Sequence, residues 1–202
     1  MHVRLLLSPA NLQRPLRALW QEPNLLRVAV AGACFGIGQG VWFTFLVSHL
    51  VVHRGLSLAA AGALFALMQV VSTVGRPLLG WLADRAGAGR VLRITCIGSG
   101  LATLALAAVS PTWPAWGVLL LVLLGGCTVS SWNGVQGAQA VYYARPGAVA
   151  EAATGGLLLI MLANVVGPVL FGLMASLGGF PLGFAVAALL TLAGWWPLRR
   201  LP

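Results

Sequence analysis

The chain has 202 residues, of which 59% are hydrophobic and only 7% are charged, and its formal net charge is +9. A soluble globular domain has about a quarter of its residues charged, so this composition excludes a water-soluble protein and indicates one that lies in a membrane. In a soluble chain, so basic a balance would point to nucleic acid. Here membrane topology explains it better, because membrane proteins keep basic side chains in cytoplasmic loops. No nucleic-acid partner is expected.

Residues 1–20 carry Arg4, Arg14 and Arg17, with one short apolar patch at Leu5–Leu7. This patch is too short for the apolar core of a secretory signal, so the first long apolar segment is expected to direct insertion. We therefore expect a cytoplasmic lead-in over residues 1–26 and a membrane-spanning bundle over residues 27–200.

Six segments are long and apolar enough to cross a bilayer, which takes about 20 residues in a helix. Charged residues or Pro and Gly turns separate them. The uncharged stretch 94–144 is divided by its Ser-Pro-Thr-Trp-Pro sequence at 110–114. The predicted spans cover 28–52, 57–82, 91–109, 115–142, 152–176 and 181–198.

Arginine placement predicts the orientation of these spans, because basic residues concentrate in cytoplasmic loops. With the amino terminus inside, only Arg54 falls on the outer side. We therefore expect both termini and the loop 84–90 to be cytoplasmic. The arginines assigned to the inner side are Arg4, Arg14, Arg17, Arg27, Arg76, Arg85, Arg90, Arg93, Arg145, Arg199 and Arg200.

Four amide side chains lie near the middle of the first, second, fourth and fifth spans: Gln39, Gln69, Asn133 and Asn164. The third and sixth spans carry no amide or charge at that depth. Such a pattern suits a three-plus-three inverted repeat with a binding site at the midplane. The alternative is that each amide bonds a neighbouring helix and only holds the bundle together. We predict that the four amides face one central cavity.

Further polar and aromatic side chains lie beside these amides. Gln136 shares a helix face with Asn133 at the i, i+3 spacing, and Trp132 precedes them. Trp42 follows Gln39 by three residues and is expected to form an aromatic wall. Together with the four amides, these residues predict a binding site for a small polar or anionic solute.

Glycines in two spans indicate close packing or bending. Gly32, Gly36 and Gly40 recur every four residues and create a flat stripe on which another helix can lie. Gly167 and Pro168 predict a bend in the fifth span, because a proline removes one helical hydrogen bond.

Neither a metal site nor a cofactor site is indicated. Cys34, Cys96 and Cys127 lie inside apolar runs without metal-ligand spacing. An intramembrane enzyme would need a histidine at the depth of the Gly98-Ser99-Gly100 turn, whereas His49 and His53 lie toward the outer edge. We therefore expect no catalytic residues.

The loop between the second and third spans reads Gly-Trp-Leu-Ala-Asp-Arg-Ala-Gly over residues 80–87. It resembles the G-x-L-A-D-R-x-G loop of the major facilitator superfamily, whose members are secondary transporters. The resemblance implies an all-α membrane protein that works by alternating access. In that family the glycine allows close packing, the Asp faces a helix N-terminus and the basic residues hold the inner face closed. These roles carry over to a gating loop made by Gly80, Asp84, Arg85, Gly87 and Arg90; the family's usual pair of basic residues after the last glycine is Ala88 and Gly89 here.

Transporters of this family normally have twelve spans in two six-span halves, so the resemblance implies one half. The segments 15–27, 132–134 and 150–156 resemble the carboxyl half of bacterial facilitators for small anions. We therefore expect a protein of the bacterial inner membrane that needs a partner half or a second copy of itself. The alternative is a truncated or degenerate bundle that does not transport. No Asp, Glu or Lys lies at mid-depth to identify a coupling ion.

Overall fold

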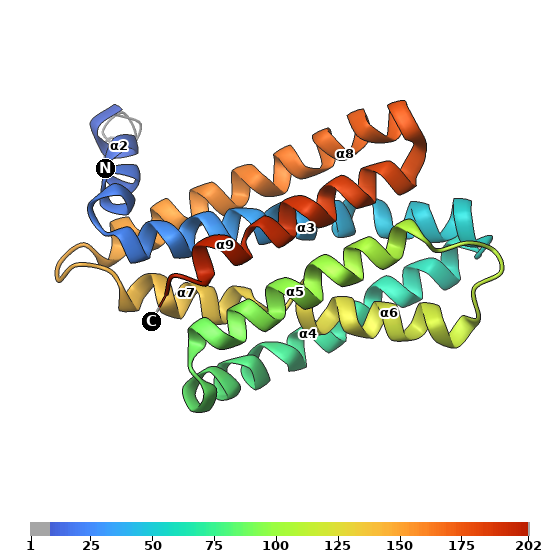
Figure 1. The fold of residues 1–202 in the computed structure, drawn as a ribbon, viewed down its shortest axis with the longest axis horizontal. Coiled ribbons are helices and arrows are strands. Elements are labelled where there is room, and N and C mark those ends of the chain that lie inside the picture. The colour runs from blue at the N-terminus through green and yellow to red at the C-terminus, as the bar shows by residue number, and fades with distance from the viewer. Residues whose placement is uncertain (1–8, 202) are drawn as a thin grey trace, which may run out of the picture.

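A computed structural model describes residues 9–201 of the chain, with side chains from Gln13 onward. Within this range every regular element is an α-helix, and the long helices lie side by side in a bundle (Figure 1). Arg4 and the Leu5–Leu7 patch lie outside the described residues. The helices are α2 (Pro9–Gln21), α3 (Pro23–Arg54), α4 (Leu58–Ala86), α5 (Ala88–Ala107), α6 (Ala115–Thr128), α7 (Asn133–Tyr142), α8 (Val149–Ala193) and α9 (Trp195–Leu198).

Five helical stretches are long and apolar enough to cross a membrane. The last of them contains two spans in succession. That stretch covers Val149–Leu198, and its backbone leaves the helical region at Gly178 and Gly179. Gly179 has a φ of 75°, a left-handed conformation that favours glycine. The chain reverses there (Figure 1), so α8 has a first arm, 149–177, and a second arm, 180–193. The six predicted spans and the all-α fold are confirmed.

Local sequence explains where the spans begin and end. Pro23 opens α3, where a proline has no hydrogen bond to lose, and Gly55 closes it with a φ of 72°. Ser57 then caps α4 through its side-chain oxygen, which accepts from the amide of Ala60 at 3.2 Å. Gly87, with a φ of 87°, ends α4 and starts α5. The predicted loop between the second and third spans is therefore a single glycine hinge.

The fourth span differs from its prediction as one continuous helix over 115–142. It breaks between α6 and α7, where hydroxyls take over backbone hydrogen bonding. Ser131 donates to the carbonyl of Gly126 at 2.6 Å. Ser72 of α4 donates to the carbonyl of Ser130 at 2.9 Å. A broken helix is tolerated at membrane depth because neighbouring side chains satisfy the freed backbone groups.

Helix α3 forms the centre of the bundle. In the most apolar stretch of α3, 56% of the residues are buried inside the bundle, against 22% in the corresponding stretch of α4. The glycine stripe lies against the first arm of α8, as predicted: a Cβ on Gly36 would stand 2.9 Å from the carbonyl oxygen of Ile160, and one on Gly40 would stand 2.5 Å from that of Asn164. Gly167 of α8 is the matching glycine in this contact, because a Cβ built on it would stand 2.6 Å from the carbonyl oxygen of Ile37 on α3. Close backbone contact therefore fixes where α3 and α8 place their polar side chains.

Candidate solute-binding site

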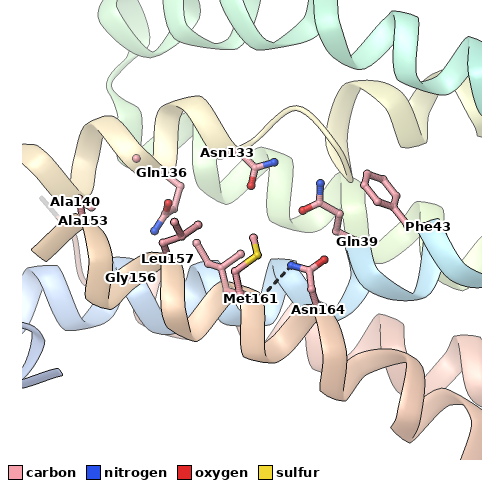
Figure 2. Close-up of a pocket in the computed structure, with 12 residues that line it drawn as sticks. Gln39, Phe43, Asn133, Gln136, Ala140, Ala153, Gly156, Leu157, Met161 and Asn164 are labelled. Atoms are coloured by element: carbon pink, nitrogen blue, oxygen red, sulfur yellow. Dashed lines mark hydrogen bonds between the residues drawn. The ribbon is translucent and has the colours of Figure 1, made fainter. Parts of the chain in front are cut away.

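A pocket of about 570 Å³ opens between α3, α7 and the first arm of α8. Figure 2 shows amide side chains from all three helices pointing toward one another across it. The lining residues are Gln39, Phe43, Asn133, Gln136, Gly137, Ala140, Ala153, Gly156, Leu157, Ile160, Met161 and Asn164. The structure thus brings together three of the four mid-depth amides, Gln39, Asn133 and Asn164, and adds Gln136.

The amides of this pocket keep hydrogen-bonding capacity to spare. Gln136 is only 5% exposed, and its side-chain nitrogen has no partner in the described part of the chain. Asn164 donates one bond to the carbonyl of Ile160, one turn back on its own helix, at 2.9 Å. A side-chain amide has two N–H donors and an oxygen with two lone pairs, so one bond leaves most of its capacity unused. The pocket can therefore donate to and accept from a bound molecule.

The remainder of the pocket wall is apolar and uncharged. Phe43, Leu157, Ile160 and Met161 supply bulk, while residues such as Gly137 and Gly156 leave room. Pockets of this kind, mostly apolar with a few convergent polar groups, are the usual form of small-molecule sites. None of the lining residues lies on α5 or on the second arm of α8. The third and sixth spans therefore stand behind the pocket, as expected.

Gln69 of α4 does not line this pocket. Its side-chain oxygen accepts a bond from the hydroxyl of Ser130 at 3.4 Å, at the break between α6 and α7. The shared depth of the four amides was thus insufficient to place them all together. Gln69 contacts a neighbouring helix, as the alternative interpretation expected for a bundle-holding amide.

Both predicted tryptophans lie in the core instead of the pocket. Trp42 is fully buried and donates to the hydroxyl of Thr103 on α5 at 2.9 Å. Trp132 stacks on Phe35 with ring centroids 4.8 Å apart and donates to the carbonyl of Val129 at 2.9 Å. The aromatic wall is formed by Phe43, four residues from Gln39. Phe43 lies four residues after Gln39, a spacing that also places two side chains on the same helix face. The sequence therefore contained a signal for Phe43 as well as for Trp42.

The predicted gating loop lies at one end of the bundle. Asp84, Arg85 and Arg90 are exposed, and the guanidinium of Arg85 lies 4.0 Å from the ring centre of Trp81. Nothing lies within 4 Å of a Cβ built on Gly80, so within the described chain this glycine makes no close approach. A second pocket of about 370 Å³ lies between α4 and α7, lined by residues that include Arg76, Gly80, Asp84 and Gln139. The gating role stays a prediction.

Gly167 and Pro168 have helical dihedral angles, since non-helical angles within α8 occur at Gly178 and Gly179 only. Gly167 is also a contact point for α3. The bend at Gly167 and Pro168 stays a prediction. No group of three His, Cys, Asp or Glu residues that could hold a metal ion occurs within the described part of the chain.

The helices and the pocket define a multi-pass membrane protein with an uncharged polar site between its spans. The sequence identifies the class: a model of the Major Facilitator Superfamily matches residues 4–155, and the chain belongs to this superfamily of secondary transporters. Its members are transporters rather than enzymes. The matched range includes the predicted gating loop, α3, α7 and the first turns of α8.

Similar curated proteins come from two bacteria. Uncharacterized MFS-type transporters of two Mycobacterium tuberculosis strains, CDC 1551/Oshkosh and ATCC 25618/H37Rv, are each 29% identical over 181 residues, covering 88% of this chain and 40% of the relative. The class E tetracycline resistance protein of Escherichia coli is 30% identical over 127 residues, covering 62% of this chain and 28% of the relative. The chain thus aligns with less than half the length of each. No solved structure matches it.

Proposed function

We propose that this chain forms one half of a secondary transporter that moves a small polar or anionic solute by alternating access. The observation that carries the proposal is the pocket, in which amides from three helices converge and the buried Gln136 nitrogen is left without a partner in the described chain. An unpaired buried donor is expensive, by about 1 to 3 kcal/mol, so a bound molecule or water is expected to fill the site.

The lining favours a solute with oxygen atoms. Amide N–H groups donate to the oxygens of a neutral polar molecule and to those of an anion alike. Because no lining residue is charged, any counter-charge for an anion would come from a partner half. Phe43, Leu157 and Met161 would cover an apolar portion. A similar protein is named for resistance to tetracycline, which makes tetracycline a reasonable first compound to test.

A second six-helix half, or a second copy of this chain, is proposed to close the pocket. The flanking helices expose apolar residues that a partner would cover, such as Val70 and Val74 on α4 and Val165 and Val169 on α8. Asp84 lines the groove between α4 and α7, where it would face the N-terminus of a partner helix. Arg85 and Arg90 would then complete the inner gate. Gly167 and Pro168 would bend as the two halves rock.

The proposed location is the bacterial inner membrane with both termini in the cytoplasm. The exposed arginines of the described residues gather at the end of the bundle that holds α2, the loop between α4 and α5, and α9 (Figure 1), which supports this orientation under the positive-inside rule. Residues 1–26 would then form the cytoplasmic lead-in, and residues 27–200 the transporting bundle.

Alternating access can be tested without knowing the solute. Gly137 lines the pocket, and nothing lies within 4 Å of a Cβ built on it, so Gly137→Cys fits without disturbing its surroundings. In a chain lacking Cys34, Cys96 and Cys127, this cysteine is expected to react with a membrane-impermeant maleimide in right-side-out and in inside-out vesicles. Both reactions are expected because each side opens in turn.

Leu101→Cys provides the matched control, since Leu101 is 54% exposed near the middle of α5, away from the pocket. It should resist the same reagent from both sides. Reaction of Gly137→Cys from one side only would contradict alternating access and would indicate a static, degenerate bundle. Failure to react from either side would contradict a water-accessible pocket.

A further inference from the structure

Four arginines gather around the carboxyl end of the described chain. Arg27 lies in the second turn of α3, Arg93 lies in the first turns of α5, and Arg199 and Arg200 follow α9. Trp195 and Trp196 of α9 lie among them. We call these six residues the C-terminal corner. It lies at the same end of the bundle as α2 and the loop between α4 and α5 (Figure 1).

The corner is held together by its own contacts. Arg27 donates to the side-chain oxygen of Asn24 at 2.7 Å and to the carbonyl of Arg200 at 3.2 Å. Arg93 donates to the carbonyl of Leu198 at 3.1 Å. Arg199 lies over the ring of Trp196, 3.3 Å from its centre, and Arg200 lies 5.5 Å from the same ring. Arg27 and Arg93 therefore fix the backbone that presents the two exposed arginines.

The positive charge of this corner is not neutralised by a carboxylate in the described structure. The one ion pair in the described part of the chain joins Arg145 to Glu22 at 2.6 Å. The chain has only two other acidic residues, Asp84 at the end of α4 and Glu151 in the first turn of α8. Within the described residues, the exposed guanidinium groups of this corner therefore remain available to an anionic partner.

The surroundings of the corner indicate a membrane surface. Neither α5 nor the second arm of α8 lines the pocket, so this side faces away from the proposed partner half and toward lipid. Helix α2 lies across the end of the bundle (Figure 1), with Trp20 75% exposed and Leu16 and Arg17 also exposed. A short amphipathic helix of this kind lies in the headgroup region, as exposed tryptophans do. The corner is therefore at the depth of phospholipid headgroups.

We propose that the C-terminal corner binds the headgroup of an anionic phospholipid in the cytoplasmic leaflet. Guanidinium groups match phosphate geometry by donating two parallel hydrogen bonds, and Arg199 and Arg200 are free to do so. Trp195 and Trp196 would pack beside the upper acyl chain. This inference rests on the proposed orientation and on the proposed position of the partner half, and it is independent of transport activity.

Brominated lipids test the proposal, because bromine quenches tryptophan only at contact. The full chain is reconstituted in phosphatidylcholine vesicles with equal fractions of brominated phosphatidylglycerol or brominated phosphatidylethanolamine. We expect the anionic lipid to quench more strongly in the parent chain. Arg199→Gln with Arg200→Gln should lower its relative affinity by about 25-fold, since each arginine near an anionic surface contributes about a factor of five.

Arg76→Gln with Arg85→Gln is the matched control, because it removes two exposed arginines from α4, away from the corner. It should preserve the preference for phosphatidylglycerol. In the parent, high salt should abolish the preference by screening, and this measurement does not depend on the folding of any variant. Equal quenching by both lipids in the parent, or equal loss in the two double variants, would overturn the assignment.

Discussion

The polar residues on the two sides of α3 differ in how their hydrogen bonds are satisfied. On the side of α5 and the second arm of α8, hydroxyls bond to backbone carbonyls: Thr103 donates to Ser99 at 2.7 Å and Thr191 donates to Ala187 at 2.8 Å. On the pocket side, the buried Gln136 nitrogen finds no partner among the described residues. Polar residues inside one bundle therefore serve two different purposes.

The chemistry of the side chains explains this difference. A threonine hydroxyl has one hydrogen, and the carbonyl four residues back on its own helix can accept it. A glutamine amide has two N–H donors and an oxygen, and no single helix can satisfy all of them. Ser99 and His49 are exceptions on the first side, since the hydroxyl oxygen of Ser99 and the Nδ1 of His49 are buried without a partner in the described chain. Amides thus keep the capacity to bind a solute, whereas most hydroxyls support the bundle.

The largest effect is expected where α3 and α8 touch and thereby shape the pocket. In Gly40→Ala the new Cβ would meet the backbone of Asn164, 2.5 Å from its carbonyl oxygen. Backbone cannot move aside easily, so we expect a loss of about 1 to 3 kcal/mol in the free energy of unfolding. Gly62→Ala is the control, because nothing lies within 4 Å of its Cβ position. Unfolding in detergent should show Gly62→Ala unchanged or stabilised.

Thr103→Val probes the side where hydroxyls support the bundle. The substitution keeps the shape but removes the acceptor for the indole N–H of the fully buried Trp42. We expect the unfolding free energy to fall by about 1 to 2 kcal/mol, while maleimide reaction of Gly137→Cys stays unchanged. In the control Thr73→Val, an exposed threonine loses a bond to the Gln69 carbonyl of its own helix. Equal losses in the two variants would mean that burial of this bond is unimportant.

Much of the fold follows from the sequence. Apolar length, turn residues and charged residues predicted six spans, and the stripe of Gly32, Gly36 and Gly40 predicted that another helix lies close to α3, although not that this helix is α8. The break within the fourth span was missed. It depends on a hydroxyl of another helix, Ser72, which donates to the carbonyl of Ser130. The sequence of the fourth span alone does not contain that partner.

The site was predicted less completely than the fold, because depth in the membrane does not specify direction. Gln39, Asn133 and Asn164 lie at the predicted depth and their side chains face the pocket. Gln69 lies at a similar depth along its span, but its side chain faces another helix. Trp42 and Trp132 were predicted to line the site because they are close in sequence to polar residues. In the structure their rings fill gaps against Gly125 and Phe35, since large aromatic side chains are most stable when buried.

Asp84→Asn is expected to act on gating and not on stability. Asp84 is exposed, so stability should change by less than about 0.5 kcal/mol. If its charge faces the N-terminus of a partner helix, its loss weakens closure of the inner gate by a factor of about two to five. Reaction of Gly137→Cys from the cytoplasmic side should accelerate by that factor, and Asp84→Glu should restore the parent rate. An unchanged rate in Asp84→Asn would reduce the motif to a topology signal.

The smallest effect on stability is expected for Gln136→Leu, and the comparison of the two sides depends on it. The amide nitrogen of Gln136 has no partner in the described chain, so a leucine of similar size removes an unsatisfied donor and breaks no bond. Gln69→Leu is the matched variant, since it breaks the 3.4 Å bond from Ser130. We expect Gln69→Leu to lose about 0.6 kcal/mol and Gln136→Leu to lose nothing or become slightly more stable.

Because Gln136 faces the pocket, its replacement should also remove the thermal stabilisation produced by any solute that stabilises the parent. A larger loss of stability in Gln136→Leu than in Gln69→Leu would show that Gln136 holds the bundle together, and that the difference between the two sides of α3 does not reflect solute binding.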